Sequence, residues 1–191
     1  MNLLESAGLG LALGFSLAVP PGPMNALIAS VSTRSSRAGT VTAFGAMSSD
    51  MLLGALVFSL NAVVDLREIV RPVDALGAVV LAYFGIRILT RREDPNPPTT
   101  SGVRTFSQGL ALGLTNPFQI LWWLTAGLAF ARLGGPVLLV GLFGAVGTWV
   151  VVFPYAIHAG ARRYPKLRSG VAIVSAGIML AFAAYFAALA L

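Results

Sequence analysis

The motif Pro20-Pro21-Gly22-Pro23 interrupts a long apolar segment that covers residues 3–32. Its three prolines remove three backbone donors, so one continuous helix cannot pass through it. Pro23 suits the first position of a new helix, whose free amides around Met24, Asn25 and Ala26 then face the break. Irregular backbone at membrane depth is tolerated only where protein buries it or where it lines a wet cavity. The break therefore predicts either a site for a substrate carboxylate at the start of the second helix or a bend without a ligand.

The composition excludes a water-soluble globular domain. Of the 191 residues, 57% are hydrophobic and only 10% are charged, whereas soluble domains have about 25% charged residues. A disordered chain requires the opposite balance. The chain contains no cysteine, which excludes disulfide, CxxC and cysteine-zinc chemistry. The basic residues behind the net charge of +6 are scattered between apolar runs, so they do not indicate a nucleic-acid-binding surface.

Six apolar stretches fill most of the chain. A transmembrane helix needs about 20 such residues to cross a hydrocarbon layer of roughly 30 Å. The pattern therefore predicts an all-α integral membrane protein with six transmembrane helices. The stretches cover residues 3–32, 38–64, 72–89, 106–130, 134–158 and 169–191.

Lysine and arginine are distributed unequally between the connections. Ten of them fall in the connections between the first and second, the third and fourth, and the fifth and sixth helices, and three fall on the opposite side. Basic residues near the ends of transmembrane helices are retained in the cytoplasm. Both termini are therefore predicted to lie outside the cytoplasm.

The longest polar stretch, residues 91–105, divides the single transmembrane domain into a first half of residues 1–90 and a second half of residues 106–191. Three helices in each half predict two inverted repeats, in which matching helices run in opposite directions. The pentapeptide Gly10-Leu11-Ala12-Leu13-Gly14 recurs as Gly109-Leu110-Ala111-Leu112-Gly113, and a proline break follows each copy. We therefore expect the first and fourth helices to be broken.

The second break is Asn116-Pro117, in the predicted fourth helix. Asn25 and Gln119 each lie two residues after the proline that begins the second piece of a broken helix. Amide side chains at these positions can bind a ligand or form hydrogen bonds between helices, and packing is the commoner role. The candidate substrate-binding residues at the two breaks are Pro21, Gly22, Pro23, Asn25, Asn116, Pro117 and Gln119.

Asp50 is the acid that lies deepest in a predicted helix, near the middle of residues 38–64. An ionised carboxylate at that depth costs about 2.5–3.5 kcal/mol on insertion scales, so we expect it to face a cavity or a partner. There it would pair with a substrate ammonium or act as a proton carrier. The alternative is a structural acid held by backbone or hydroxyl groups, and Ser48 and Ser49 place hydroxyl groups beside it.

Two residues of the fifth stretch are left open. His158 ends the stretch beside a basic connection, which favours solvation at the membrane interface over a buried proton relay. Trp149 lies near the middle of the stretch and could wall a pocket, although packing is the commoner role of such a residue.

These features together resemble the LysE/RhtB-type amino-acid exporters over almost the whole chain. The resemblance rests on Pro21-Gly22-Pro23 followed by Asn25, on Arg34 and Arg37 before Ala38-Gly39, on Asp50, and on Asn116-Pro117. Members of that family are small prokaryotic inner-membrane proteins that expel amino acids or related compounds with the ion gradient, so the resemblance implies export. By analogy, the residues that match the family's motifs are Pro21, Gly22, Pro23, Asp50, Asn116 and Pro117. The chain departs from the family at Phe118-Gln119, where Lys-Ala is usual, and at Ser49, where Gly is usual, and these departures bear on the substrate.

The favoured hypothesis is a secondary exporter that holds an amino acid or related zwitterion between the two broken helices, with Asp50 as the proton-coupling residue. The alternatives are a channel or exporter for an inorganic or metal ion, and a membrane subunit that transports nothing. An enzyme is not expected, because the sequence contains no Ser-His-Asp set, H-E-x-x-H motif or phosphate-binding loop. We expect no cofactor, no metal site and no nucleic-acid partner. The expected surroundings of the chain are the lipid bilayer, and a homodimer is left open.

Overall fold

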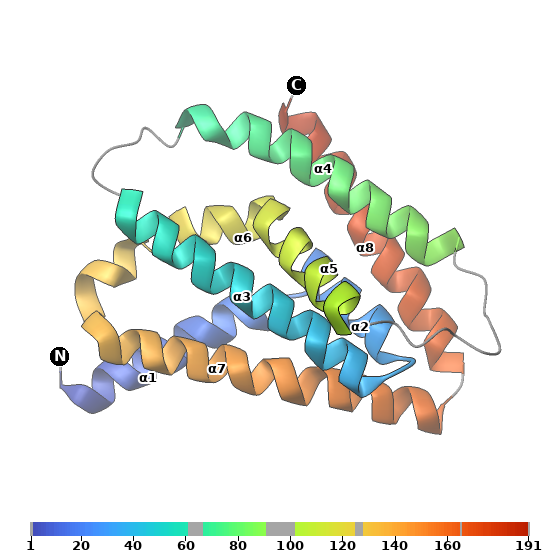
Figure 1. Ribbon diagram of the computed structural model, residues 1–191, viewed down its shortest axis with the longest axis horizontal. Helices are drawn as coiled ribbons and strands as arrows, with labels where there is room; N and C mark the ends of the chain where they lie inside the picture. The colour runs from blue at the N-terminus through green and yellow to red at the C-terminus, as the bar shows by residue number, and fades with distance from the viewer. Residues whose placement is uncertain (1, 61–66, 91–101, 125–127, 165, 191) are drawn as a thin grey trace.

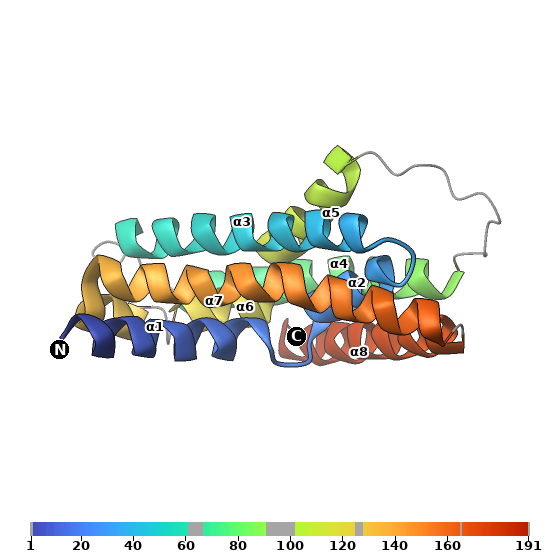
Figure 2. The same cartoon turned by 90° about the horizontal axis from the view of Figure 1, so that it is seen from below.

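The structure is a computed structural model that describes residues 2–60, 67–90, 102–124, 128–164 and 166–190. Within these ranges it contains eight helices and no strand, which confirms the prediction of an all-α protein. The helices α1 and α7 run side by side, and α3, α7 and α1 lie in successive layers (Figures 1 and 2). The helices are α1 (Leu3–Ala18), α2 (Pro23–Ser32), α3 (Ser36–Leu60), α4 (Arg67–Thr90), α5 (Gly102–Thr115), α6 (Pro117–Trp122), α7 (Leu128–Arg163) and α8 (Lys166–Ala190).

The first apolar segment is broken where its prolines lie. The helix α1 ends at Ala18, α2 begins at Pro23, and the two helices are bent by 75° relative to each other. The fourth predicted helix is also two helices, since α5 ends at Thr115 and α6 begins at Pro117. The predicted breaks in the first and fourth helices are therefore present in the backbone.

Three helices extend beyond their predicted boundaries. The helix α7 has 36 residues and extends beyond the predicted 134–158 at both ends, and α4 starts at Arg67 and contains Pro72 in its interior. Glycine and proline therefore do not end these two helices, although a proline removes one helical hydrogen bond. The helix α5 begins at Gly102, so the last part of the predicted linker is helical, while residues 91–101 lie outside the described residues.

Glycines bring α1 and α7 into close contact. A methyl group added to Gly10 of α1 would collide with the Leu138 carbonyl oxygen of α7. In return, a methyl group added to Gly141 of α7 would collide with the Ala7 carbonyl oxygen of α1. Small residues of this kind let two helix backbones approach closely in a membrane.

The same arrangement joins α3 and α5. A methyl group added to Gly109 of α5 would collide with the Thr42 carbonyl oxygen of α3. A methyl group added to Gly45 of α3 would collide with the Phe106 carbonyl oxygen of α5. The two copies of the repeated pentapeptide therefore occupy corresponding helix contacts in the two halves of the chain.

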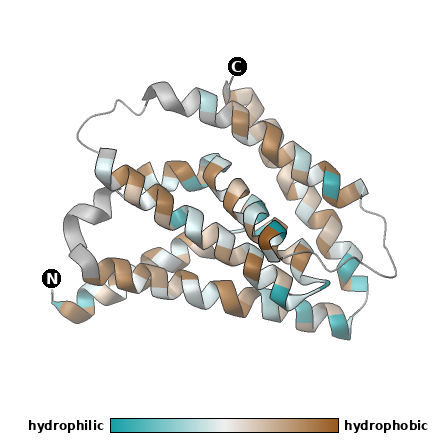
Figure 3. Ribbon diagram, viewed as in Figure 1, coloured by the Kyte–Doolittle hydropathy of each residue, from teal (hydrophilic) through white to brown (hydrophobic). Residues whose placement is uncertain are grey.

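Several helices are long and apolar enough to cross a membrane. Three qualify by themselves, over Ser36–Val57, Val137–Arg163 and Lys166–Leu189, and α1 with α2 qualifies as a bent pair. The helix α4 contributes a shorter apolar helix over Ala75–Thr90. Hydrophobic residues run along most of the helices (Figure 3), and large aliphatic side chains such as Val140 and Ile173 are exposed.

An aliphatic exterior is the surface of a protein surrounded by lipid rather than by water. The chain is accordingly a multi-pass membrane protein. Among the described residues, three spans and one bent pair meet the criteria of length and hydropathy. The arrangement of six spans in two inverted repeats stays a prediction at this point.

Candidate functional site

Asn25 holds the first break together by binding the backbone at the end of α1. Its side-chain nitrogen Nδ2 donates to the Ala18 carbonyl oxygen at 2.6 Å and to the Pro20 carbonyl oxygen at 2.9 Å. The last carbonyl groups of a helix have no partner within the helix. Asn25 supplies that partner, so its side chain fixes the geometry of the break.

The start of α2 carries free backbone donors. Gly22 is extended at the N-cap position and no side chain caps the helix. Pro23 has no N–H, and the first amide that forms a backbone hydrogen bond is that of Ala26, to the Gly22 carbonyl oxygen at 2.9 Å. The amides of Met24 and Asn25 donate to none of the described residues, so this helix end offers two donors and the positive end of its dipole.

Asn116 forms the second break and is almost completely buried. Its backbone is extended between α5 and α6, and its Oδ1 accepts a hydrogen bond from the Phe118 amide at 3.2 Å. This bond is the usual N-cap interaction at a helix start. The Asn116 side-chain nitrogen donates to none of the described residues, and the residue is only 2% exposed. A buried donor of this kind is available to a ligand or to water.

Asp50 of α3 is buried next to the second break. Its Oδ1 accepts hydrogen bonds from Gln119 Nε2 at 2.7 Å and from Trp123 Nε1 at 2.9 Å. Gln119 Nε2 also donates to Ser49 Oγ at 2.9 Å, so Gln119 joins α6 to α3. The other carboxylate oxygen, Oδ2, accepts from none of the described residues although Asp50 is only 6% exposed.

Trp149 of α7 connects the first break to the other half of the chain. Its Nε1 donates to Asn25 Oδ1 at 3.1 Å, which engages the remaining polar atom of the Asn25 side chain. The Trp149 ring stacks on Phe153, with ring centroids 4.9 Å apart and an angle of 10° between the planes. Each break is thus tied by its amide residue to a helix of the opposite half.

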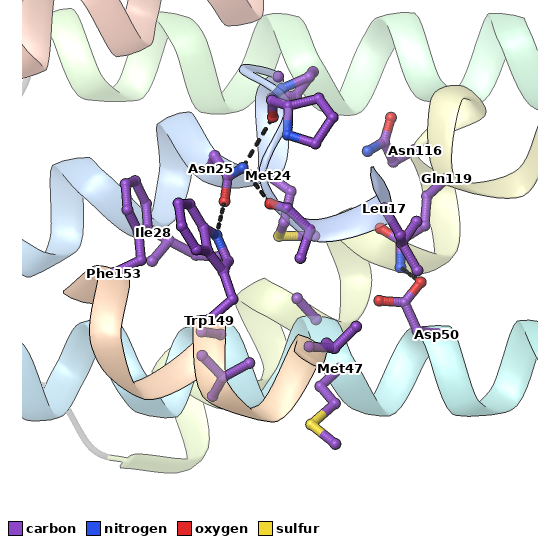
Figure 4. A pocket seen from close by; sticks show the side chains of 18 of the residues that line it. Leu17, Met24, Asn25, Ile28, Met47, Asp50, Asn116, Gln119, Trp149 and Phe153 are labelled. Atoms are coloured by element: carbon purple, nitrogen blue, oxygen red, sulfur yellow. Dashed lines mark hydrogen bonds between the residues drawn. The ribbon is translucent and has the colours of Figure 1, made fainter. Parts of the chain in front are cut away.

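One cavity collects these groups, and Figure 4 shows it from close by. Its volume is about 60 Å³, and one water needs at least about 10–15 Å³, so the cavity has room for a few waters. Helices α1, α2, α3, α6 and α7 contribute to its wall. The polar groups of the lining come from Asn25, Asp50, Asn116 and Gln119.

The structure brings most of the sequence-predicted residues to this cavity. Two of the eight are not part of its lining: Pro21 is exposed, and Pro117 packs against Gly77 of α4. The six that line the cavity are Gly22, Pro23, Asn25, Asp50, Asn116 and Gln119. Their roles toward a substrate stay predictions.

Several lining residues were missed by sequence reasoning, although their spacing contains the signal. The lining residues of α3 lie at positions 43, 46, 47 and 50, and those of α7 at positions 146, 149, 150 and 153. Both sets follow the i, i+3, i+4, i+7 spacing of one helix face. Counting back from Asp50 would have found Met47, and counting on from Trp149 would have found Phe153.

His158 lies outside the cavity lining. Its Nδ1 is 3.0 Å from the Ser32 carbonyl oxygen at the end of α2, and the side chain is half-buried. A carbonyl oxygen only accepts, so Nδ1 carries the proton in this contact. The residue therefore joins α7 to α2, and its solvation at the membrane interface stays a prediction.

An all-helical membrane protein with interrupted helices around a polar cavity has the organisation of a secondary transporter. The comparison with protein families agrees with this class. The family model for the LysE type translocators matches residues 15–191, which is nearly the whole chain. The protein belongs to the LysE type translocator family and is a membrane transporter, which confirms the family resemblance. Searches of the curated proteins and of the solved structures found no match to the chain.

Proposed function

We propose that this protein is a secondary exporter of amino acids or related small zwitterions across the cytoplasmic membrane of a prokaryote. The observation that carries the proposal is the cavity in which the two helix breaks and the buried Asp50 meet. An amino acid carries an ammonium and a carboxylate a short distance apart. The cavity offers groups of both complementary kinds within one lining.

The ammonium group binds the free oxygen of Asp50 in this proposal. Asp50 Oδ1 already accepts two hydrogen bonds, whereas Oδ2 accepts from none of the described residues. A buried carboxylate is costly unless it is paired, so a cation that reaches Oδ2 gains more than it would in water. The Asn116 side-chain amide completes the polar end of the cavity.

The carboxylate group binds the start of α2. The uncapped amides of Met24 and Asn25 point back at the break. A helix N-terminus stabilises an anion by up to about 2 kcal/mol in a partly buried setting. The cavity has room for only a few waters in this conformation, so the surrounding helices must move apart to admit a substrate.

The alternating exposure needed for export follows if one three-helix half rocks against the other. The packing of the glycines supports two inverted repeats. Gly10 on the α7 backbone corresponds to Gly109 on the α3 backbone, and Gly141 on the α1 backbone corresponds to Gly45 on the α5 backbone. If α1 matches α5 and α3 matches α7, as two repeats require, the contact between α1 and α7 matches the contact between α5 and α3.

The positions of the helix ends support the orientation in the membrane. The end of α2, the start of α3, the end of α4 and the start of α5 lie toward the same end of the molecule as the junction between α7 and α8 (Figure 1). In the sequence, these ends and the connections between them carry ten of the thirteen basic residues. The positive-inside rule places that end in the cytoplasm and both termini outside it.

Asp50 also couples transport to the proton gradient in this proposal. It takes up a proton when the substrate ammonium leaves, which avoids an unpaired buried charge in the empty carrier. The substitution Asp50→Asn removes the proton acceptor. It should abolish efflux driven by a pH gradient from proteoliposomes that contain the purified protein, while the variant stays folded.

The experiment measures efflux of labelled amino acids with and without an imposed pH gradient. Glu5→Gln is the matched control, because it removes an exposed acid at the start of α1, outside the cavity. Efflux of the Asp50→Asn variant that still responds to the gradient would refute the coupling role. Flux of an inorganic ion with no response to any amino acid would refute the export proposal as a whole.

A further inference from the structure

The cavity has two chemically different ends. In Figure 4, Asp50 and Gln119 lie at one end, and Trp149, Phe153 and Ile28 lie at the other. The polar end holds the Asp50 carboxylate, which is the charged side chain among the described lining residues. A ligand that fills the whole cavity must therefore carry a positive charge at the Asp50 end. Its other end must suit the side chains around Trp149 and Phe153.

The end opposite Asp50 is apolar and aromatic. Trp149 and Phe153 lie one helical turn apart on α7, and their rings are stacked with centroids 4.9 Å apart. The Trp149 indole nitrogen is already donating to Asn25 Oδ1, so the residue offers the cavity its ring and not a polar atom. Val146 and Val150, on the same face of α7, are 4% and 3% exposed. These side chains form a dry surface for an apolar group.

The polar groups of an amino-acid backbone are satisfied before this surface is reached. The ammonium pairs with Asp50, and the carboxylate meets the free amides at the start of α2. The side chain then extends along the face of α7. A charged side chain would be desolvated there against rings and aliphatic groups without a partner, which is unfavourable for either sign of charge.

We propose, resting on the export function proposed above, that the substrates are amino acids with uncharged apolar side chains, such as leucine and methionine. Trp149, Val150 and Phe153 form the side-chain subsite. The subsite sets the specificity of the transporter, while Asp50 and the start of α2 recognise the backbone common to all amino acids.

Counterflow in proteoliposomes tests the substrate class directly. Vesicles containing the purified protein are loaded with unlabelled leucine, methionine, alanine, lysine or glutamate, and uptake of the same labelled amino acid is measured. One methylene in an apolar pocket changes discrimination by about 10–200-fold. Leucine and methionine are therefore expected to exchange at least about tenfold more efficiently than alanine, lysine or glutamate.

The outcomes separate the two proposals. Lysine or glutamate exchanging as well as leucine would overturn the apolar subsite and leave the export function standing. A protein that exchanges none of the five would overturn the export function, and the subsite with it. A preference for leucine and methionine of about tenfold or more supports both.

A substitution in the subsite should change the ratio of leucine to alanine exchange, which a merely structural role of the residue would not change. Phe153→Ser should lower the preference for leucine over alanine by about tenfold, while exchange of alanine continues. Phe182→Ser is the matched control, because Phe182 is a half-buried ring of α8 outside the lining. An unchanged ratio of leucine to alanine exchange in Phe153→Ser would overturn the assignment, and retained alanine exchange shows that the variant is folded.

Discussion

Replacing Asp50 with asparagine separates the structural role of this carboxylate from the substrate-binding role proposed for it. One oxygen holds helices together, since Oδ1 accepts from Gln119 of α6 and from Trp123. The other oxygen is the group proposed to bind the substrate ammonium. Asparagine keeps an oxygen that can accept both hydrogen bonds. It replaces the second oxygen with a neutral NH2 group, which donates and cannot pair with a cation.

The expected loss of affinity follows from the burial of Asp50, which is 6% exposed. Removing one partner of a buried, hydrogen-bonded charge pair costs about 2–5 kcal/mol. Because each 1.4 kcal/mol is a factor of ten in affinity, the variant should bind substrate at least about 30-fold more weakly. The free energy of unfolding should change by less than about 1 kcal/mol, which corresponds to a melting shift of about 2–4 °C in a chain of this size.

Equilibrium binding of labelled leucine to the purified protein in detergent measures the first quantity, and thermal unfolding of the same sample measures the second. Glu5→Gln is again the control for loss of one acid, with binding expected to stay at the wild-type value. The reasoning is refuted if folded Asp50→Asn binds leucine with wild-type affinity. It is also refuted if the variant unfolds many degrees lower, because asparagine would then have failed to preserve the hydrogen bonds to Oδ1.

The remaining predictions concern packing and the first break. Gly10→Ala and Gly109→Ala should each lower the free energy of unfolding by about 1–3 kcal/mol, because the added methyl group meets backbone on the facing helix. Thermal unfolding checks this against Gly8→Ala, where a methyl group meets nothing within 4 Å and little change is expected. Trp149→Phe removes the donor to Asn25 and should cost about 0.5–1.5 kcal/mol with leucine binding largely kept, since an aromatic ring still lines the cavity. A loss of binding with unchanged stability in this variant would contradict that division of roles.

The breaks and the buried acid could be predicted from the sequence because their causes are local. A proline removes a donor at its own position, so Pro20, Pro21, Pro23 and Pro117 mark the breaks without knowledge of the fold. An acid in an apolar stretch such as Asp50 is costly wherever the helix packs. Local chemistry of this kind is visible in a single chain.

The ends of the helices and the partners of the polar groups could not be predicted in the same way. The helix α4 passes through Pro72, whereas a proline inside a predicted helix usually ends or kinks it. Asn25 and Trp149 are 124 positions apart in the chain, and no short-range pattern connects them. The spacing of Trp149 and Phe153 marks one face of α7, but nothing local in the sequence shows that this face packs against the first break.

The two breaks are similar in backbone and different in their partners. In each, an amide side chain two residues after a proline reaches a helix of the opposite half, Asn25 to Trp149 and Gln119 to Asp50. The bond to Trp149 joins two neutral groups, so neither substrate nor proton changes the charge of its partners. The bond to Asp50 joins an amide to a group whose charge changes when a proton or an ammonium binds, and a hydrogen bond to a charged group is roughly twice as strong as a neutral one. The hydrogen bond between α3 and α6 is therefore the one whose strength changes with the occupant of the cavity, whereas neither a proton nor a substrate changes the charge of the groups that join α2 to α7.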